Sequence, residues 1–175
     1  MKNNLTGEPK STFEFLEEEV YLPGYMTLAS ANYDSGGADF LFNIKEPRVT
    51  RGDFVHYFTP RGLHICVSQA GYALAEYLAG QEELRNINPQ VLRSTLLQGR
   101  VRITELFQRF RKEIELSEPL PGRFDISKLR LGKIPILKLN FEFAGGVVTG
   151  NLISLIAPVP GPQINQDVLR FNHEK

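Results

Sequence analysis

The amino-acid sequence predicts an α+β fold in which an antiparallel sheet wraps around one central, buried helix. The first observation is the segment 64–78, whose apolar residues cover nearly the whole circumference of a helix. A helix that is apolar all round is buried rather than lying on a surface. The second is that the chain after residue 100 is dominated by strand patterns. A buried helix followed by a run of antiparallel strands is the layout of a sheet curled around that helix.

The central helix follows a break at Pro60-Arg61-Gly62. At 1.5 Å per residue its apolar run is roughly 24 Å long. That length, with polar residues at both ends, is too short to span a bilayer. We therefore expect a core helix and no membrane partner.

The N-terminal part is expected to contribute a hairpin. Residues 1–12 are polar and expected to be loose, and 13–20 fit either a short helix or part of a first strand. Alternating residues in 25–33 and 39–44 indicate two strands. Between them 34–39 contains a Gly pair, which is typical of a turn.

After the central helix the sequence predicts a short helix and four strands. Asn88-Pro89 is a helix start, with Asn as N-cap and Pro at the first helical position, and Gly99 ends that helix. Ala144-Gly145-Gly146 predicts a tight hairpin between the last two strands. The four strands, expected in meander order, are 102–116, 124–131, 134–143 and 147–157.

Composition narrows the class of protein. A chain of 175 residues without low-complexity sequence fits one domain, 1–175. Twenty Lys and Arg balance twenty Asp and Glu, so no global basic field predicts a nucleic-acid partner. The single Cys66 excludes an intrachain disulfide framework. No apolar secretory segment follows Met1, so a soluble cytoplasmic protein is expected.

Several familiar catalytic motifs are missing from the sequence. It has no Gly-rich phosphate loop, no pair of histidines in i, i+4 register and no G-x-S-x-G elbow. We therefore expect no cofactor and no catalytic metal. Basic residues outnumber acidic ones between 100 and 133. This bias fits either an anionic carrier such as the phosphates of coenzyme A or ordinary solvated strand surface.

The start of the central helix is the predicted site. The first amides of a helix lack intrahelical partners and lie at the positive end of its dipole. The N–H groups around Gly62, Leu63 and His64 would then form an oxyanion hole for a thioester carbonyl. Arg61, just before them, is expected to bind substrate as well. The alternative is that Gly62 only makes the turn.

The polar residues near this helix start are candidates for proton transfer. His64 is the first choice as general base for a water, against a capping or core role. His56 and Tyr57, on the preceding loop, are candidates for hydrogen bonds to the carbonyl or the water, against simple packing. Ser68 and Gln69 interrupt an apolar helix, so each either holds a water or satisfies neighbouring backbone. Gln69 is expected to face the same tunnel as His64.

The stretch IKEPRVTRGDFVHYF leading into LHICVSQAGYALAEYL, especially Ile65, Cys66 and Gln69, resembles the hotdog superfamily. Within it the segment is most similar to the FcoT-like long-chain acyl-CoA thioesterases. That family carries Asn where this chain has His64 and an amide where it has Ser68. The resemblance implies a hotdog fold and a homodimer or higher homo-oligomer joined edge to edge. It also implies hydrolysis of acyl-CoA or acyl-carrier-protein thioesters without a covalent nucleophile or metal.

Two alternatives remain open at the level of sequence. GDFVHYF and SQAG also resemble 3-hydroxyacyl dehydratases, which need a His and a carboxylic acid. The helix position at which that family carries its acid is Ile65 here. A third interpretation is a non-catalytic module that binds acyl chains.

Overall fold

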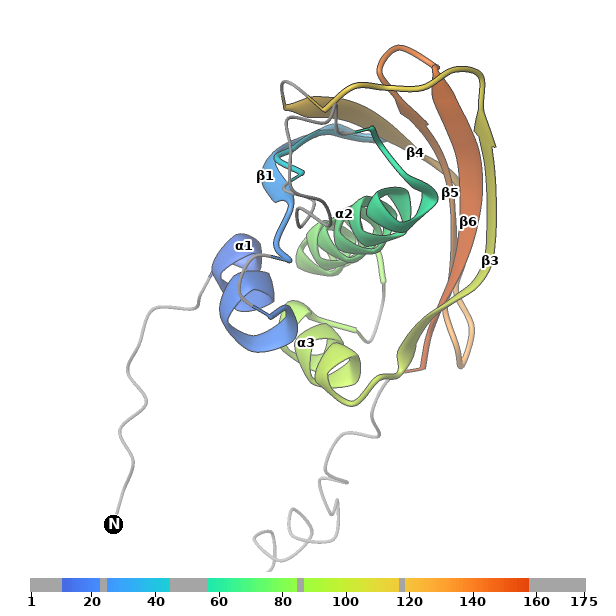
Figure 1. Cartoon of the computed structure of the whole chain (residues 1–175). Coiled ribbons are helices and arrows are strands. Elements are labelled where there is room, and N and C mark those ends of the chain that lie inside the picture. Colours follow the sequence, from blue (N-terminus) through green and yellow to red (C-terminus); the bar gives the residue numbers. More distant parts are fainter. Residues whose placement is uncertain (1–10, 23–24, 45–56, 85–86, 117–118, 158–175) are drawn as a thin grey trace, which may run out of the picture.

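The computed structural model describes residues 11–22, 25–44, 57–84, 87–116 and 119–157. It consists of one six-stranded antiparallel sheet curled around a long helix, α2 (Pro60–Gly80). The remaining helices pack on the side of α2 that the sheet leaves uncovered (Figure 1). The predicted α+β architecture is therefore confirmed.

Helix α2 begins four residues before the predicted segment. Thr59 is its N-cap, and the Thr59 hydroxyl accepts a hydrogen bond from the Gly62 N–H at 3.1 Å. Pro60 occupies the first helical position, where its missing N–H costs nothing. The Pro-Arg-Gly triplet is thus the first turn of the helix rather than a break before it. Most of α2 is buried, and Leu74 is completely so.

The N-terminal segment is helical, which decides between the two alternatives for residues 13–20. A single α-helical turn, α1 (Thr12–Phe15), runs into a π-helical turn, η1 (Leu16–Val20). Ser11 and Glu14 form a capping box, in which each side chain accepts from the other's backbone N–H. Phe15 and Leu16 are buried, and the Phe15 ring lies 6.0 Å from that of Tyr72 in α2.

All six predicted strands are present, although their order is not a meander. Neighbours in the sheet follow the order β1-β2-β4-β5-β6-β3, so the first strand after α3 (Pro89–Leu97) lies at an edge beside the last strand. The strands are β1 (Leu28–Tyr33), β2 (Gly37–Phe42), β3 (Val101–Phe110), β4 (Leu120–Arg130), β5 (Ile136–Phe143) and β6 (Val148–Ile156).

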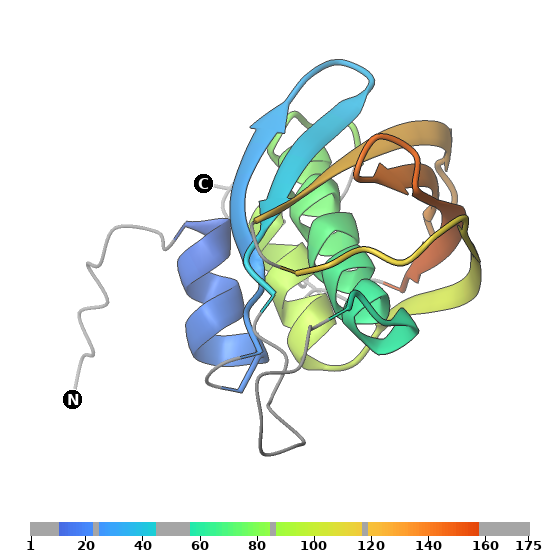
Figure 2. The ribbon, with the colours of Figure 1, turned by 45° about the horizontal axis from the view of Figure 1, so that its top comes forward.

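The connection between β3 and β4 explains why the expected meander is wrong. Near its middle the Phe58 N–H donates to the Ile114 carbonyl at 2.8 Å, and Tyr57 forms a β-bridge with Glu115. The chain therefore crosses the start of α2 instead of turning back along β3, as Figure 2 shows. β4 then pairs with β2, and β6 returns to pair with β3.

The inward faces of β2, β4 and β5 supply an aromatic core. Phe124 lies near the centre of this group, with its ring 5.3 Å from Phe40 and 5.7 Å from Phe143. The alternation that predicted the 134–143 strand holds, because Leu137, Leu139, Phe141 and Phe143 are all buried. Burial of large aromatic side chains is a main stabilising term of such a core.

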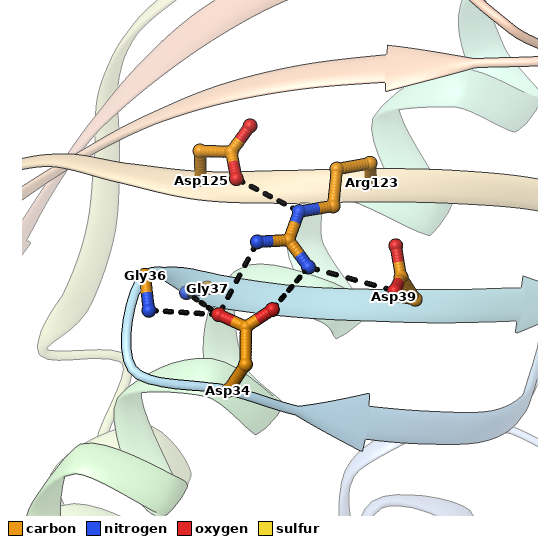
Figure 3. A network of polar contacts seen from close by, with 6 residues as sticks. All are labelled: Asp34, Gly36, Gly37, Asp39, Arg123 and Asp125. Carbon is orange, nitrogen blue, oxygen red and sulfur yellow. Dashed lines mark hydrogen bonds and ion pairs between the residues drawn. The ribbon is translucent and has the colours of Figure 1, made fainter.

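One end of the convex face of the sheet carries a closed charge network. Arg123 of β4 binds Asp34, Asp39 and Asp125, with its shortest contact 2.6 Å from Nη1 to Asp34 Oδ2 (Figure 3). Hydrogen bonds from Arg123 and from the backbone of the turn lower the pKa of Asp34 from 3.8 to about 2. A lowered pKa means that this network stabilises the fold above pH 4 and weakens as the pH falls toward 2.

Near its C-terminal end, α2 is joined to α3 by a buried ion pair between Glu76 and Arg93. Glu76, only 5% exposed, accepts from Arg93 Nε at 2.9 Å. The Arg93 guanidinium also lies 4.9 Å above the Phe15 ring. A charge this deeply buried needs such a partner.

No helix in the described part of the chain has the length and apolar character needed to cross a membrane.

Candidate functional site

A cavity of about 390 Å³ lies between α2 and the β6-β3 end of the sheet. Its volume falls in the range of ordinary small-molecule pockets. Most of the wall is apolar, and the polar groups gather on α2, on Tyr21 and at the sheet end. The lining residues are Tyr21, His64, Val67, Ser68, Gly71, Tyr72, Leu96, Val101, Arg102, Ile103, Leu152 and Ser154.

His64 and Ser68 both line this cavity. They are one turn apart on α2, a spacing that places both side chains on one face. The Ser68 hydroxyl donates to the His64 carbonyl at 2.8 Å, so its proton is used within the helix and its lone pairs remain as acceptors. His64 is exposed at the cavity wall.

Two of the backbone N–H groups predicted to form an oxyanion hole, those of Gly62 and Leu63, already have hydrogen-bond partners in the structure. The Gly62 N–H donates to the Thr59 hydroxyl, and the Leu63 N–H donates to the Thr59 carbonyl at 2.9 Å. Both residues are buried, and neither lines the cavity. The expectation that the Gly62 and Leu63 amides bind a thioester carbonyl is therefore wrong, because Thr59 accepts a hydrogen bond from each of them. Arg61 stands exposed in the same first turn.

Gln69 faces away from His64, so the expectation of a shared tunnel is wrong. Its side chain is completely buried, and its Oε1 accepts from the Thr27 N–H, the Thr27 hydroxyl and the Leu28 N–H at 2.8–3.0 Å. Its Nε2 donates to the Tyr25 carbonyl at 2.9 Å. Gln69 thus fixes the start of β1 to α2, which is the backbone-satisfying alternative that the sequence left open.

Tyr57, the loop candidate that the structure describes, does not line the cavity. Tyr57 is 44% exposed and lies beside Glu115, outside the set of cavity residues. His56 lies outside the described residues, and its predicted role stays a prediction.

Two tyrosines at the cavity were missed from the sequence. Burial, with a smaller effect of nearby Cys66, raises the pKa of Tyr21 to about 12. Burial and the neighbouring Glu76 raise the pKa of Tyr72 far above its ordinary value. Both phenols therefore stay protonated at neutral pH and keep an O–H. Tyr72 was detectable, because positions 64, 68 and 72 form one helical stripe, whereas nothing in the sequence places Tyr21 against α2.

The cavity contains one permanently charged side chain, Arg102, at the start of β3. No carboxylate lines it among the described residues. Within the same ranges, no three His, Cys, Asp or Glu side chains come close enough to hold a metal ion. The chemistry available at these walls is thus that of an imidazole, hydroxyl groups and an arginine beside an apolar space.

Solved structures show the same fold. A candidate thioesterase from Shewanella oneidensis superposes with a TM-score of 0.54 at 13% identity, covering 85% of this chain and 95% of its own. A candidate thioesterase from Syntrophus aciditrophicus gives 0.51 at 10% identity, covering 82% and 91%. No family model and no curated protein sequence matches the chain. With the sheet wrapped around α2, these similarities identify the architecture as the hotdog fold.

Proposed function

We propose that this protein is an acyl-thioester hydrolase that acts on fatty acyl-CoA or acyl-carrier-protein thioesters. The observation that carries the proposal is the cavity of about 390 Å³, which has apolar walls and places His64 and Ser68 on one face of α2. An acyl chain fits the apolar part, and the thioester group would then lie against the polar stripe. The two solved structures described as candidate thioesterases share the fold and agree with this proposal.

In the proposed reaction His64 accepts a proton from a water molecule, and the resulting hydroxide attacks the thioester carbonyl carbon. The tetrahedral intermediate collapses with cleavage of the carbon–sulfur bond. The thiolate then takes the proton from His64, which leaves a carboxylic acid and a free thiol. Ser68 Oγ, whose lone pairs are open, accepts a hydrogen bond from the attacking water.

The carbonyl oxygen needs a donor in place of the Gly62 and Leu63 amides, which donate to Thr59. We assign this role to the phenol of Tyr21, which lines the cavity and keeps its O–H at neutral pH. Donors aimed at a developing oxyanion are among the largest contributions to acyl-transfer catalysis.

The dehydratase alternative lacks a group in the described structure. Dehydration of a 3-hydroxyacyl thioester needs a carboxylic acid together with the histidine, and no acid lines the cavity. Ile65 occupies the helix position where such an acid was expected. No observation favours this alternative over hydrolysis.

The proposal is tested by incubating the protein with acyl-CoA and acyl-carrier-protein thioesters of increasing chain length. Hydrolysis is measured as the release of free thiol. We expect turnover to depend on chain length, because the cavity has a fixed volume. Binding of acyl chains without release of thiol for any panel member would replace hydrolysis by the acyl-binding alternative.

Gly71 offers a test of where the acyl chain lies. A Cβ at this position would meet Leu152 and Leu139 at 3.8 and 3.9 Å, which is ordinary contact. We therefore expect Gly71→Ala to raise the free energy of unfolding by about 0.5–1 kcal/mol, because Ala is favoured over Gly inside a helix. Gly71→Leu extends into the cavity, so it should shift the preferred acyl length downward, as read from kcat/KM across the panel. An unchanged length preference in Gly71→Leu would place the chain elsewhere.

We also propose that two copies pair through the β3 edges of their sheets. β3 pairs only with β6 among the described strands, which leaves one edge open. Open edges are aggregation hazards unless they are paired or covered. Phe107 on this strand is 62% exposed, and Val101, Arg102 and Ile103 of the same strand line the cavity, so a partner would lie close to it.

Light scattering at micromolar concentration should therefore report a dimer, and Phe107→Lys should shift it toward monomer. Leu97→Lys, which changes a 54% exposed residue on α3, is the matched control and should leave the dimer intact. A monomeric wild-type protein would contradict the proposed pairing.

A further inference from the structure

The convex face of the sheet holds a second hollow, on the surface opposite to α2. It has a volume of about 270 Å³, and its cationic residues come from the ends of β4 and β5. We call it the basic hollow; it is lined by Lys128, Arg130, Ile136, Lys138 and Ile153. The proposed hydrolysis uses none of these residues.

In the described part of the chain, no carboxylate neutralises the charges in the basic hollow. Lys128 and Lys138 are direct cross-strand partners, an arrangement in which like charges destabilise a sheet. A β-bulge between Ile126 and Lys128 brings them into this register. Among the described residues, Lys128, Arg130 and Lys138 form no ion pair with a carboxylate. Three cationic side chains therefore line the basic hollow with no carboxylate paired to them within the described ranges.

Arg123, at the opposite end of the convex face, is a cation that does have carboxylate partners. There Arg123 is surrounded by Asp34, Asp39 and Asp125, so its charge is fully engaged (Figure 3). On one face of the sheet, Arg123 is thus paired with three carboxylates, whereas the described residues provide no carboxylate to the cations of the basic hollow. A repulsive lysine pair beside an open volume is explained if an anion occupies it.

We propose that the basic hollow binds the diphosphate of a nucleoside diphosphate group. Lys128 and Lys138 would share one phosphate from opposite strands, and Arg130, two residues along β4, would take the second with its planar guanidinium. Ile136 and Ile153 supply an apolar floor for the base or ribose. A single small anion would leave this floor and part of the charge unused.

The proposal does not depend on the proposed hydrolysis. Ser154 of β6 lines the cavity beside α2, whereas its neighbour Ile153 lines the basic hollow, so the two sites lie on opposite faces of one strand. Hydrolysis of an acyl thioester of N-acetylcysteamine, which carries no phosphate, tests the cavity alone. Failure of one site is therefore distinguishable from failure of the other.

The test is binding of ADP, pyrophosphate, inorganic phosphate and adenosine by calorimetry at low and high salt. We expect ADP to bind most tightly, pyrophosphate less tightly and phosphate weakest of the anions, with affinity falling as salt is raised. Lys128→Gln with Lys138→Gln should weaken ADP binding about tenfold or more, because two charge-assisted contacts are lost. The same double variant should melt at a higher temperature, since it removes the like-charge pair.

Arg109→Gln is the matched control, because it removes a charge from exposed β3 at a distance from the basic hollow. It should leave ADP binding unchanged. Equal loss in the control, no ADP binding in the wild-type protein, or ADP binding that the double variant leaves intact would each overturn the proposal. Phosphate binding as tight as ADP would overturn the nucleotide assignment and leave a simple anion site.

Discussion

Replacing His64 by Ala is expected to lower kcat for thioester hydrolysis by ~10²–10⁴-fold and to leave KM nearly unchanged. His64 is the one imidazole among the described residues that faces the cavity, and its position on α2 fixes its direction. Because the imidazole is proposed to take a proton from water in the transition state, its loss removes an interaction that the bound substrate does not make. Steady-state thiol release measures the effect.

Two further variants make this result interpretable. Ser68→Ala removes a hydroxyl whose proton already bonds to the helix, so a much smaller loss is expected than for His64→Ala. His56→Ala tests the other predicted base in the same assay. Near-normal hydrolysis in both histidine variants would exclude His64 and His56 as the base, and catalysis would then rest on polarisation of the carbonyl. The melting temperature of each variant shows whether lost activity reflects lost fold.

Local signals in the sequence predicted the elements well because each has a local physical cause. Asn88 caps α3 through a hydrogen bond from the Val91 N–H at 2.9 Å, as Asn-Pro at 88–89 indicated. Ala144, Gly145 and Gly146 all adopt positive φ in the turn between β5 and β6. Such features depend on a few neighbouring residues and survive into the fold.

The strand order could not be predicted in the same way. Leu106 and Phe110 of β3 face inward whether the strand pairs with β4 or with β6. The alternation of apolar and polar residues therefore does not predict which strand lies next to β3. The choice is made by the chain between β3 and β4, through the contact of Ile114 with Phe58. That contact joins residues far apart in the sequence.

In the candidate site too, local relations could be predicted from the sequence and contacts between distant segments could not. His64 and Ser68 lie together because one helical turn separates them, a local property that can be read from their spacing. Gln69 was misplaced because its partners, Tyr25, Thr27 and Leu28, lie about forty positions earlier. The rule that a buried amide needs partners was correct, but it does not say which segment provides them.

Replacing Gln69 by Leu is expected to cause a large loss of stability. Leucine fits an apolar surrounding, yet it leaves the N–H groups of Thr27 and Leu28 and the carbonyl of Tyr25 without their partner. Each buried backbone group without a partner costs about 1–3 kcal/mol. The free energy of unfolding should therefore fall by roughly 3 kcal/mol or more, measured by urea denaturation.

The matched control for this variant is Gln90→Leu, which makes the same chemical change at an exposed position of α3. It should alter the free energy of unfolding by less than about 0.5 kcal/mol. Because Gln69 holds the start of β1 and does not touch the cavity, residual folded Gln69→Leu protein should hydrolyse thioester with a normal kcat. A stable Gln69→Leu protein with a strongly reduced kcat would show the opposite: that Gln69 acts at the catalytic site and not as the link between α2 and β1.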